Sequence, residues 1–270
     1  MDRRSFLVAL AAGLAVAAAG RGTDSPIEPV AAGPPTAGPP GTSPAEVTPQ
    51  PASVVADGLP APRPAPTGVV SALPGEGRLL ALTVDDGTDT EVVAAFARLA
   101  TDTGIRLTFF PNGRYASWTD NARVLRPLVD SGQVALGNHT WSHPDLTSLS
   151  DAAVASEIRR NRDFLRNVFG VENTPFLRPP YGVHNARTDR IAADLGHPTI
   201  AMWNGSLDDG RLIDAHGLVQ AAKRWFRLQT IVIGHANHPT VTTVFDELLA
   251  ILADRRLTTV TLADVWSNAA

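Results

Sequence analysis

The sequence contains no cysteine. Disulfide bonds are therefore excluded, and so is the lipid-modified cysteine that can follow an export signal. A domain of about 200 residues does not depend on disulfides, because the fraction of surface buried on folding rises with chain length. The lack of cysteine is thus compatible with an exported, stably folded protein.

The sequence also lacks any run rich in lysine or arginine. It has 23 basic and 27 acidic residues, a formal net charge of −4 and a pI near 6.0. Clustered basic residues are the usual footprint of nucleic-acid binding, so we expect no nucleic-acid partner. The hydrophobic content of 44% is typical of a soluble globular protein with a substantial core.

The apolar stretch near the N-terminus is short. It runs from Phe6 to Ala19, about 14 residues, whereas a membrane-spanning helix needs roughly 20. The stretch follows Arg3 and Arg4 and is followed by small residues, an order typical of an export signal of the twin-arginine type. We predict a cleaved signal peptide at 1–20, no transmembrane span in the mature protein, and an extracellular or cell-envelope location. A retained membrane anchor is the alternative.

The stretch after the predicted signal peptide has no apolar periodicity. Residues 21–68 are dominated by proline, alanine, glycine, serine and threonine. Such a composition cannot bury enough apolar surface to offset the entropy lost on ordering. We predict a disordered linker at 21–68 and a catalytic domain at 69–270.

The remainder alternates short apolar runs with amphipathic segments, the rhythm of strands alternating with helices. The glycine fingerprint of dinucleotide-binding folds is missing after the first run. About seven repeats favour a barrel or a barrel-like parallel sheet. We predict strands at 78–84, 106–110, 133–137, 175–178, 199–203, 230–234 and 258–262. We predict helices at 90–104, 119–132, 150–170, 185–197, 214–229 and 244–256.

Polar side chains gather at the ends of these predicted strands, which is where β/α barrels carry their chemistry. The first strand ends in Asp85-Asp86 and the third leads into His139. Arg178 ends the fourth strand, and His235 directly follows the sixth. We therefore expect these side chains to meet at one rim.

His139 and His143 are four residues apart, a spacing that places two side chains on one face of a helical turn. The glutamate that follows the first histidine in zinc-protease helices is missing, because Thr140 stands there. Carboxylates must come from elsewhere, and Asp85-Asp86 is the best source. Two histidines and one aspartate suit catalytic zinc or a similar divalent ion, and non-haem iron uses the same set. The aspartate of this pair that does not bind the metal would be the base, and His235 would be the acid.

Four ordered motifs carry a family resemblance: "TVDDG", "HTWSH", "RPPYG" and "IVIGH". Over residues 75–265 the chain resembles the polysaccharide deacetylases of carbohydrate esterase family 4, also called the NodB-homology domain. The resemblance implies a distorted (β/α) barrel that removes acetyl groups from sugar polymers. It also implies one divalent metal ion, with Zn²⁺ expected first and Co²⁺, Ni²⁺ or Mn²⁺ as alternatives.

The resemblance further implies a role for each motif residue. Asp85 would be the base, held by Arg178, and His235 would be the acid. The backbone N–H of Tyr181 would stabilise the oxyanion, with Trp203 also on the substrate side. The metal ligands would be Asp86, His139 and His143.

The chain departs from the family pattern after Trp203. Where the family has D-x-x-D-W, this sequence has Ser206, Asp209 and Gly210. We expect Asp209 to tune Arg178 or His235, and Gly210 to remove an aromatic wall of the acetyl pocket. His184 and His238 are further histidines near the motifs, and the sequence assigns them no role.

We therefore predict a secreted, monomeric, metal-dependent hydrolase. Its substrate would be an acetylated polysaccharide of cell-wall or chitin type, with N-acetyl groups favoured over O-acetyl groups. One alternative is a glycan-binding module with weak or no turnover. Another is a metal-dependent hydrolase of a different C–N substrate.

Overall fold

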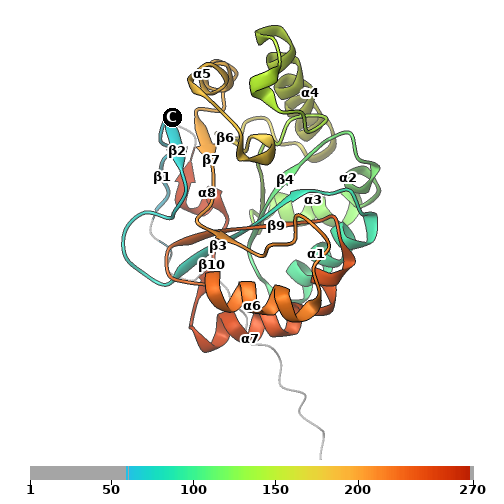
Figure 1. Ribbon diagram of the computed structural model, residues 1–270, viewed down its shortest axis with the longest axis vertical. Coiled ribbons are helices and arrows are strands. Elements are labelled where there is room, and N and C mark those ends of the chain that lie inside the picture. Colours follow the sequence, from blue (N-terminus) through green and yellow to red (C-terminus); the bar gives the residue numbers. More distant parts are fainter. Residues whose placement is uncertain (1–58, 60, 268–270) are drawn as a thin grey trace, which may run out of the picture. The chain divides into compact units, whose positions relative to one another are not determined.

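The computed structural model describes residue 59 and residues 61–267 (Figure 1). The predicted signal peptide at 1–20 and most of the predicted linker at 21–68 lie outside the described residues. Within the described part of the chain, no helix combines the length and apolar character needed to cross a membrane.

Parallel strands form the centre of the domain. The larger sheet has the order β5-β4-β3-β9-β8, with β10 also paired to β3, and a smaller sheet has the order β2-β7-β6. Every ladder in the two sheets is parallel. The strands are β2 (Gly68–Val70), β3 (Leu79–Asp86), β4 (Leu107–Pro111), β5 (Val134–Leu136), β6 (Phe176–Leu177), β7 (Thr199–Ala201), β8 (Gly205–Ser206), β9 (Thr230–His235) and β10 (Thr258–Thr259).

Two isolated bridges join these sheets. Asn138, just after β5, pairs with Leu177 of β6, and Ala72, just after β2, pairs with Thr230 of β9. The sheets therefore meet along both flanks, which gives a distorted barrel and confirms the predicted fold class. The seven predicted strands correspond to β3, β4, β5, β6, β7, β9 and β10.

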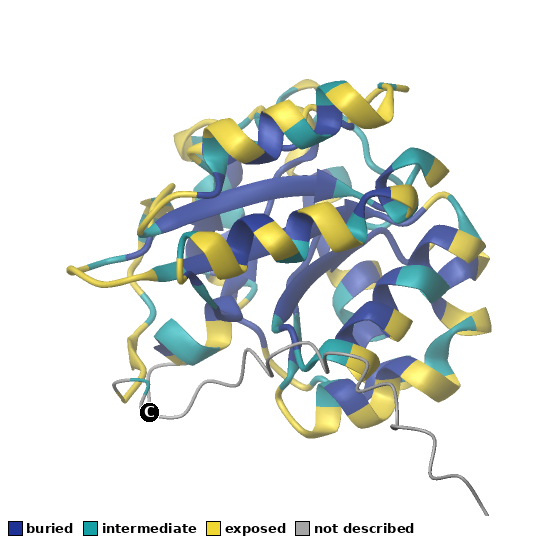
Figure 2. Ribbon diagram, turned by 90° about the horizontal axis from the view of Figure 1, so that it is seen from below, coloured by how far each residue is buried: buried dark blue, intermediate teal, exposed yellow. Residues whose placement is uncertain are grey.

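Helices cover the outer faces of the sheets, and Figure 2 shows buried strands between helices whose outer sides are exposed. The six predicted helices all form, and the short helices α2 and α8 add to them. The α-helices are α1 (Thr90–Thr103), α2 (Ala116–Asp120), α3 (Ala122–Asp130), α4 (Asp151–Phe169), α5 (Ala186–Asp194), α6 (Ala215–Trp225), α7 (Phe245–Asp254) and α8 (Leu262–Val265). The 3-10 turns are η1 (Leu146–Ser148), η2 (Pro180–Gly182) and η3 (Pro239–Thr243).

Cap residues set the ends of the helices that the sequence predicted best. The Asp89 side chain accepts hydrogen bonds from the backbone N–H groups of Glu91 and Val92 at the start of α1. Gly104 ends α1 in the left-handed conformation, with φ of 73°. Satisfied terminal groups of this kind explain why the sequence located these helices closely.

The strand pairing extends into the predicted linker. Strand β1 (Arg63–Pro64) pairs in parallel with β11 (Trp266–Ser267), and Gly68 at the start of β2 pairs with Thr199 of β7. The folded domain thus begins N-terminal to the predicted boundary at residue 69. The reason is that backbone hydrogen bonds, which need no apolar side-chain pattern, tie this segment to β7 and β11.

Phe96 ties α1 to the sheet and to α7. Its side chain is fully buried, and its ring centroid lies 6.1 Å from that of Phe109 in β4 and 5.0 Å from that of Phe245 in α7. Close packing of this kind leaves a cavity when a large side chain is truncated.

We expect Phe96→Ala to lower the free energy of unfolding by about 3–5 kcal/mol, from lost burial and the cavity left behind. Equilibrium unfolding in urea measures the change. Val124→Ala, on the exposed side of α3, is the control and should cost less than about 0.5 kcal/mol. A loss below about 1 kcal/mol for Phe96→Ala would contradict this assignment of the core.

Candidate active site and metal centre

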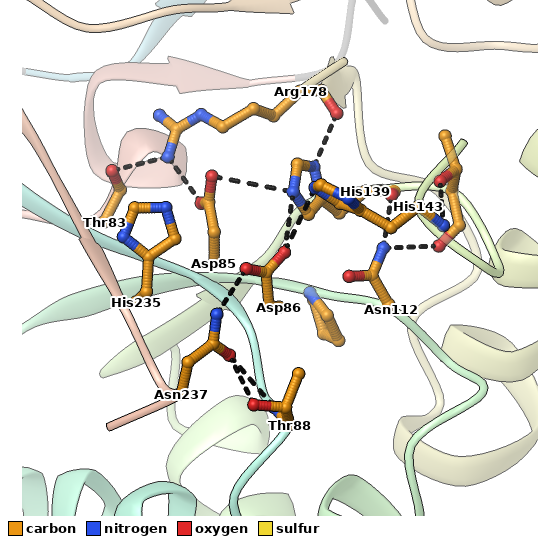
Figure 3. Close-up of polar contacts among 12 residues, drawn as sticks. Thr83, Asp85, Asp86, Thr88, Asn112, His139, His143, Arg178, His235 and Asn237 are labelled. Carbon is orange, nitrogen blue, oxygen red and sulfur yellow. Dashed lines mark hydrogen bonds and ion pairs between the residues drawn. The ribbon is translucent and has the colours of Figure 1, made fainter. Parts of the chain in front are cut away.

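Strand β3 delivers two adjacent carboxylates to one rim of the barrel. Adjacent residues in a regular strand point to opposite faces, so both can serve one site only if the strand ends there. Asp86 adopts a positive φ of 68°, and Gly87 follows with φ of 89°. The turn therefore begins at Asp86 itself, and Figure 3 shows both carboxylates at the centre of the site.

Arg178 holds Asp85. Its Nη1 donates to Asp85 Oδ1 at 2.7 Å and to Thr83 Oγ1 at 2.7 Å, and its Nε donates to the carbonyl of Ala201 at 2.8 Å. Arg178 is 0% exposed and Asp85 is 2% exposed, so this is a buried, charge-assisted hydrogen bond. The guanidinium also lies 4.1 Å above the ring of Phe110. The side chain is locked, and with it one oxygen of Asp85.

Asp86, His139 and His143 converge on one point. Asp86 Oδ1 lies 3.2 Å from His139 Nε2 and 3.3 Å from His143 Nε2. One donor atom from each residue lies within 4.8 Å of the others, a geometry that could hold a metal ion. Asp86 Oδ1 is buried and has no hydrogen-bond partner among the described residues, as expected for a group whose natural partner is a cation. The residues therefore fit a divalent ion.

The tautomer of His139 agrees with this fit. Its Nδ1 lies 2.7 Å from the carbonyl oxygen of Arg178, and a carbonyl can only accept, so Nδ1 carries the hydrogen. In the neutral imidazole, Nε2 then carries the lone pair and faces Asp86 Oδ1. A backbone partner on the far nitrogen is the usual way to orient a histidine ligand.

The three groups also shift one another's proton affinity. Burial alone raises the pKa of Asp86, but the neighbouring imidazoles of His139 and His143 hold it well below its usual range. Burial lowers the pKa of His139, and the charges of Asp85 and Asp86 outweigh this and raise it. Burial and the charge of His139 lower the pKa of His143. The two imidazoles that share this carboxylate oxygen thus have pKa values shifted in opposite directions.

A buried asparagine network supports the loop that carries both histidines. Asn112 Nδ2 donates to the carbonyls of His139 at 2.6 Å and Thr140 at 3.1 Å. Asn138 Oδ1 accepts from the Thr140 backbone N–H at 2.9 Å and from Asn161 Nδ2 at 3.1 Å. All three asparagines are 0% exposed. A fully buried polar network fixes a unique loop geometry, because a broken contact would leave a polar group unsatisfied.

His197 completes this network as a neutral imidazole. Its Nδ1 donates to the carbonyl of Thr174 at 2.8 Å, so its Nε2 can accept from Asn138 Nδ2 at 3.1 Å. Burial lowers the pKa of His197 to about 4. His197 thus stabilises the loop that carries His139 and His143.

His235 lies beside the two carboxylates, paired in register with Asp85 across β9 and β3. Its Nδ1 is 2.9 Å from Asp209 Oδ1, and its backbone N–H donates to Asp209 Oδ2 at 3.0 Å. Burial lowers the pKa of His235, but the hydrogen bond to Asp209 and the negative charges nearby raise it to about 9. Asp209 therefore contacts His235, one of the two partners that the sequence offered for it.

A cavity of about 600 Å³ is lined by Asp85, Asp86, His139, His143 and His235. Tyr181 and Trp203 line it too, and Tyr181 is 67% exposed with its ring 4.5 Å from that of His143. Gly210 also lines the cavity, and a β-carbon there would lie 3.2 Å from His235 Cε1. A side chain at this position would cover the His235 ring, so glycine leaves that ring open to the cavity.

Strained backbone is concentrated around the cavity. Four residues that line it have positive φ values between 59° and 68°: Asp86, His143, Tyr181 and Asp208. Thr140, in the loop of the two histidines, also has a positive φ, of 68°. Non-glycine residues in this region each cost of order 1 kcal/mol and are enriched at functional sites. The strained residues and the polar side chains therefore gather around the same cavity.

Two further histidines lie outside the cavity lining. His184 Nδ1 lies 2.9 Å from Asp189 Oδ2 on a part-exposed surface, and His238 stands just before η3 with no side-chain cap hydrogen bond. The site also contains residues that the motifs did not assign. They are Thr83, Asn112, Trp118, whose Nε1 donates to the Asp86 carbonyl at 2.8 Å, and Asn237, whose Nδ2 donates to Asp86 Oδ2 at 2.7 Å.

The sequence is similar to a known protein family and to several of its members. Residues 73–200 match the family described as polysaccharide deacetylase. The peptidoglycan-N-acetylglucosamine deacetylase PgdA of Listeria monocytogenes is 26% identical over 189 residues, which cover 70% of this chain and 39% of that protein. The chain spans about half the length, or less, of the first curated relatives that it matches.

Solved structures show the same fold. The chitin deacetylase of the fungal pathogen Colletotrichum lindemuthianum aligns with a TM-score of 0.67 at 23% identity, covering 76% of this chain and 94% of that one. A family 4 pseudoenzyme of Bacillus anthracis aligns with a TM-score of 0.64 at 18% identity, covering 75% and 71%. The family profile, the curated relatives and the fold agree, and residues 73–200 of this chain belong to the polysaccharide deacetylase family, carbohydrate esterase family 4 with the NodB-homology domain.

Proposed function

We propose that this protein is a metal-dependent hydrolase that removes acetyl groups, N-acetyl groups first, from a polysaccharide. One observation carries the proposal. A complete set of hydrolytic groups faces a single cavity: the Asp86, His139 and His143 cluster, the Arg178-bound Asp85, and the Asp209-bound His235. A binding site has no need of a carboxylate and an imidazole that are each anchored by a charged partner.

Asp86, His139 and His143 would hold the ion, and Zn²⁺ fits two imidazoles and one carboxylate best, with Co²⁺, Ni²⁺ or Mn²⁺ as alternatives. Bound there, a divalent ion supplies Lewis acidity, which polarises the acetyl carbonyl and lowers the pKa of water. The network of Asn112, Asn138 and Asn161 keeps the loop of both histidines in place, so the ligands are arranged before the ion arrives.

Asp85 is the proposed base. Arg178 fixes one carboxylate oxygen, Oδ1, and the other, Oδ2, lies 3.7 Å from His139 Nε2 and faces the cluster. The carboxylate accepts a proton from the water that attacks the acetyl carbonyl carbon. Because the guanidinium cannot give up its proton, it orients Asp85 without competing as an acid.

His235 is the proposed acid. Asp209 binds its Nδ1–H, so its Nε2 presents the transferable proton to the cavity. As the C–N bond breaks, His235 gives this proton to the departing sugar nitrogen, and acetate and a free amine result. We propose that the backbone N–H of Tyr181, at a strained turn on the cavity rim, donates to the oxyanion that forms in between.

The substrate would be a cell-wall or chitin-type polymer. Supporting this, the relatives include a peptidoglycan deacetylase and a chitin deacetylase by name. The predicted signal peptide and linker would place the domain at the cell envelope or outside the cell, where such polymers occur. Tyr181 and Trp203 offer aromatic faces to a sugar ring at the rim of the cavity. We propose that the domain acts as a monomer.

Glycan binding without turnover is the second candidate. Gly210 opens the cavity beside His235, and one structural neighbour is described as a pseudoenzyme. The intact Asp85–Arg178 and His235–Asp209 pairs favour turnover. Activity measurements on the full chain separate the two.

The zinc-loaded wild type should release acetate from N-acetylated glycan oligomers, and a chelator should abolish the release. Asp85→Asn should lower kcat by about 10²–10⁴-fold, because the base is lost, with little change in KM. Asp151→Asn, an aspartate paired to Arg187 outside the cavity, is the matched control and should leave kcat unchanged. Glycan binding without acetate release, unaffected by Asp85→Asn, would contradict catalysis and favour the binding module.

Asp209→Asn should lower the pKa of His235, because it removes a charge and a charged hydrogen bond. The acid must be protonated, so activity is lost as the pH rises through this pKa. The alkaline limb of the pH–activity curve should therefore move to lower pH by about one unit or more. In the metal-free wild type, NMR should find His235 titrating at about 9.

Asp189→Asn, which removes the carboxylate partner of His184 outside the cavity, is the control for this shift and should leave the alkaline limb in place. An unchanged His235 titration in Asp209→Asn would contradict the assigned role of Asp209.

A further inference from the structure

Asn237 lies two residues beyond His235, at the point where the chain leaves β9. Its Nδ2 donates to Asp86 Oδ2 at 2.7 Å (Figure 3). Its Oδ1 accepts from both the backbone N–H of Thr88 at 3.1 Å and the Thr88 hydroxyl at 3.0 Å. The backbone N–H of Thr88 can only donate, so it must face the oxygen of the amide. The orientation of the Asn237 amide, with its nitrogen toward Asp86, is therefore determined.

Because of this contact, the two carboxylate oxygens of Asp86 have different partners. Asn237 binds Oδ2, whereas Oδ1 faces His139 and His143 and has no hydrogen-bond donor among the described residues. The carboxylate is thus prevented from rotating, and a single oxygen is presented to the histidine pair. A carboxylate free to rotate would lose this arrangement and pay side-chain entropy on binding an ion.

The backbone of Asp86 is fixed separately. Its carbonyl accepts from Trp118 Nε1 at 2.8 Å and from the Asn112 backbone N–H at 3.2 Å, which hold the strained positive φ. These contacts place the α-carbon of Asp86, but they do not set the rotation of its carboxylate. Asn237 supplies that remaining constraint.

The neutral amide suits this task. Asp85 is held by the cation Arg178, which offsets the negative charge of that carboxylate. A cation on Asp86 would in the same way oppose the charge that attracts a metal ion, whereas an amide donor leaves that charge in place. The two adjacent aspartates are therefore anchored by donors of different charge.

We propose that Asn237 is a positioning residue of the metal site, which orients the Asp86 carboxylate so that Oδ1 meets the ion together with the two imidazoles. The inference rests on the proposed metal-dependent function and deepens it. Asn237 acts through Asp86 and touches neither substrate nor ion. Loss of such an outer hydrogen bond typically costs about 10–100-fold in metal affinity.

The test is the Kd of the full chain for Zn²⁺ alone, measured by competition with a chromogenic chelator, with no substrate present. Asn237→Leu keeps the size of the side chain and removes the amide. We expect its Kd to rise by about 10–100-fold, and the visible absorption of the Co²⁺-loaded protein to change in intensity as the ligand set distorts. Asn237→Ala is the second variant, in case the leucine perturbs folding.

Asn204→Leu is the matched control. Its side chain also binds β9, through the backbone N–H of Ile231 at 3.0 Å, but it has no contact with Asp86. We expect its Kd to stay within about twofold of the wild type. Melting temperatures of the metal-free variants within about 3 °C of the wild type show that folding is intact.

The outcomes are distinct. A Kd for a folded Asn237 variant within about twofold of the wild type would overturn this inference and leave the proposed function standing. A wild type that binds no divalent ion would overturn the proposed metal site itself, and the inference with it.

Discussion

The site depends on the buried guanidinium of Arg178. A fully buried cation is stable only if it is paired and its hydrogen bonds are satisfied, and losing one partner of such a pair costs about 3–5 kcal/mol. Here the partners are Asp85 and Thr83 on β3 and the carbonyl of Ala201 on β7, so one side chain bridges the two sheets of the barrel. The backbone carbonyl of Arg178 accepts a hydrogen bond from His139 Nδ1. The proposed base and one proposed metal ligand are therefore set by the same residue.

Around this interaction, the site gives two adjacent carboxylates different partners. Asp85 faces a fixed cation, while Asp86 faces two imidazoles that share one of its oxygens. In the proposed mechanism, these different partners suit Asp85 to act as the base and Asp86 to bind the ion. The strained turn at Asp86 makes the arrangement possible, because it brings both side chains to the same rim.

The sequence predicted the framework and the residues that end its strands, because periodicity, caps and strand ends are local properties. It placed Asp85, His139 and His235 at one rim, as the structure has them. It did not find Asn237, Asn112 or Trp118, since their contacts with Asp86 or with the histidine loop join segments far apart in the chain. It also left the partner of Asp209 open for the same reason. The sequence predicts a linker up to residue 68, because composition does not reveal strands that pair through backbone groups, as β1 and β2 do.

The central claim is that Asp86, His139 and His143 hold one divalent ion in a site arranged by Arg178 and the surrounding amides. A crystal structure of the zinc-loaded protein, with anomalous diffraction collected at the zinc edge, tests it most directly. We predict one anomalous peak, about 2.0–2.2 Å from Asp86 Oδ1, His139 Nε2 and His143 Nε2. No peak at these three residues in zinc-soaked crystals, or a peak held by other side chains, would contradict the account.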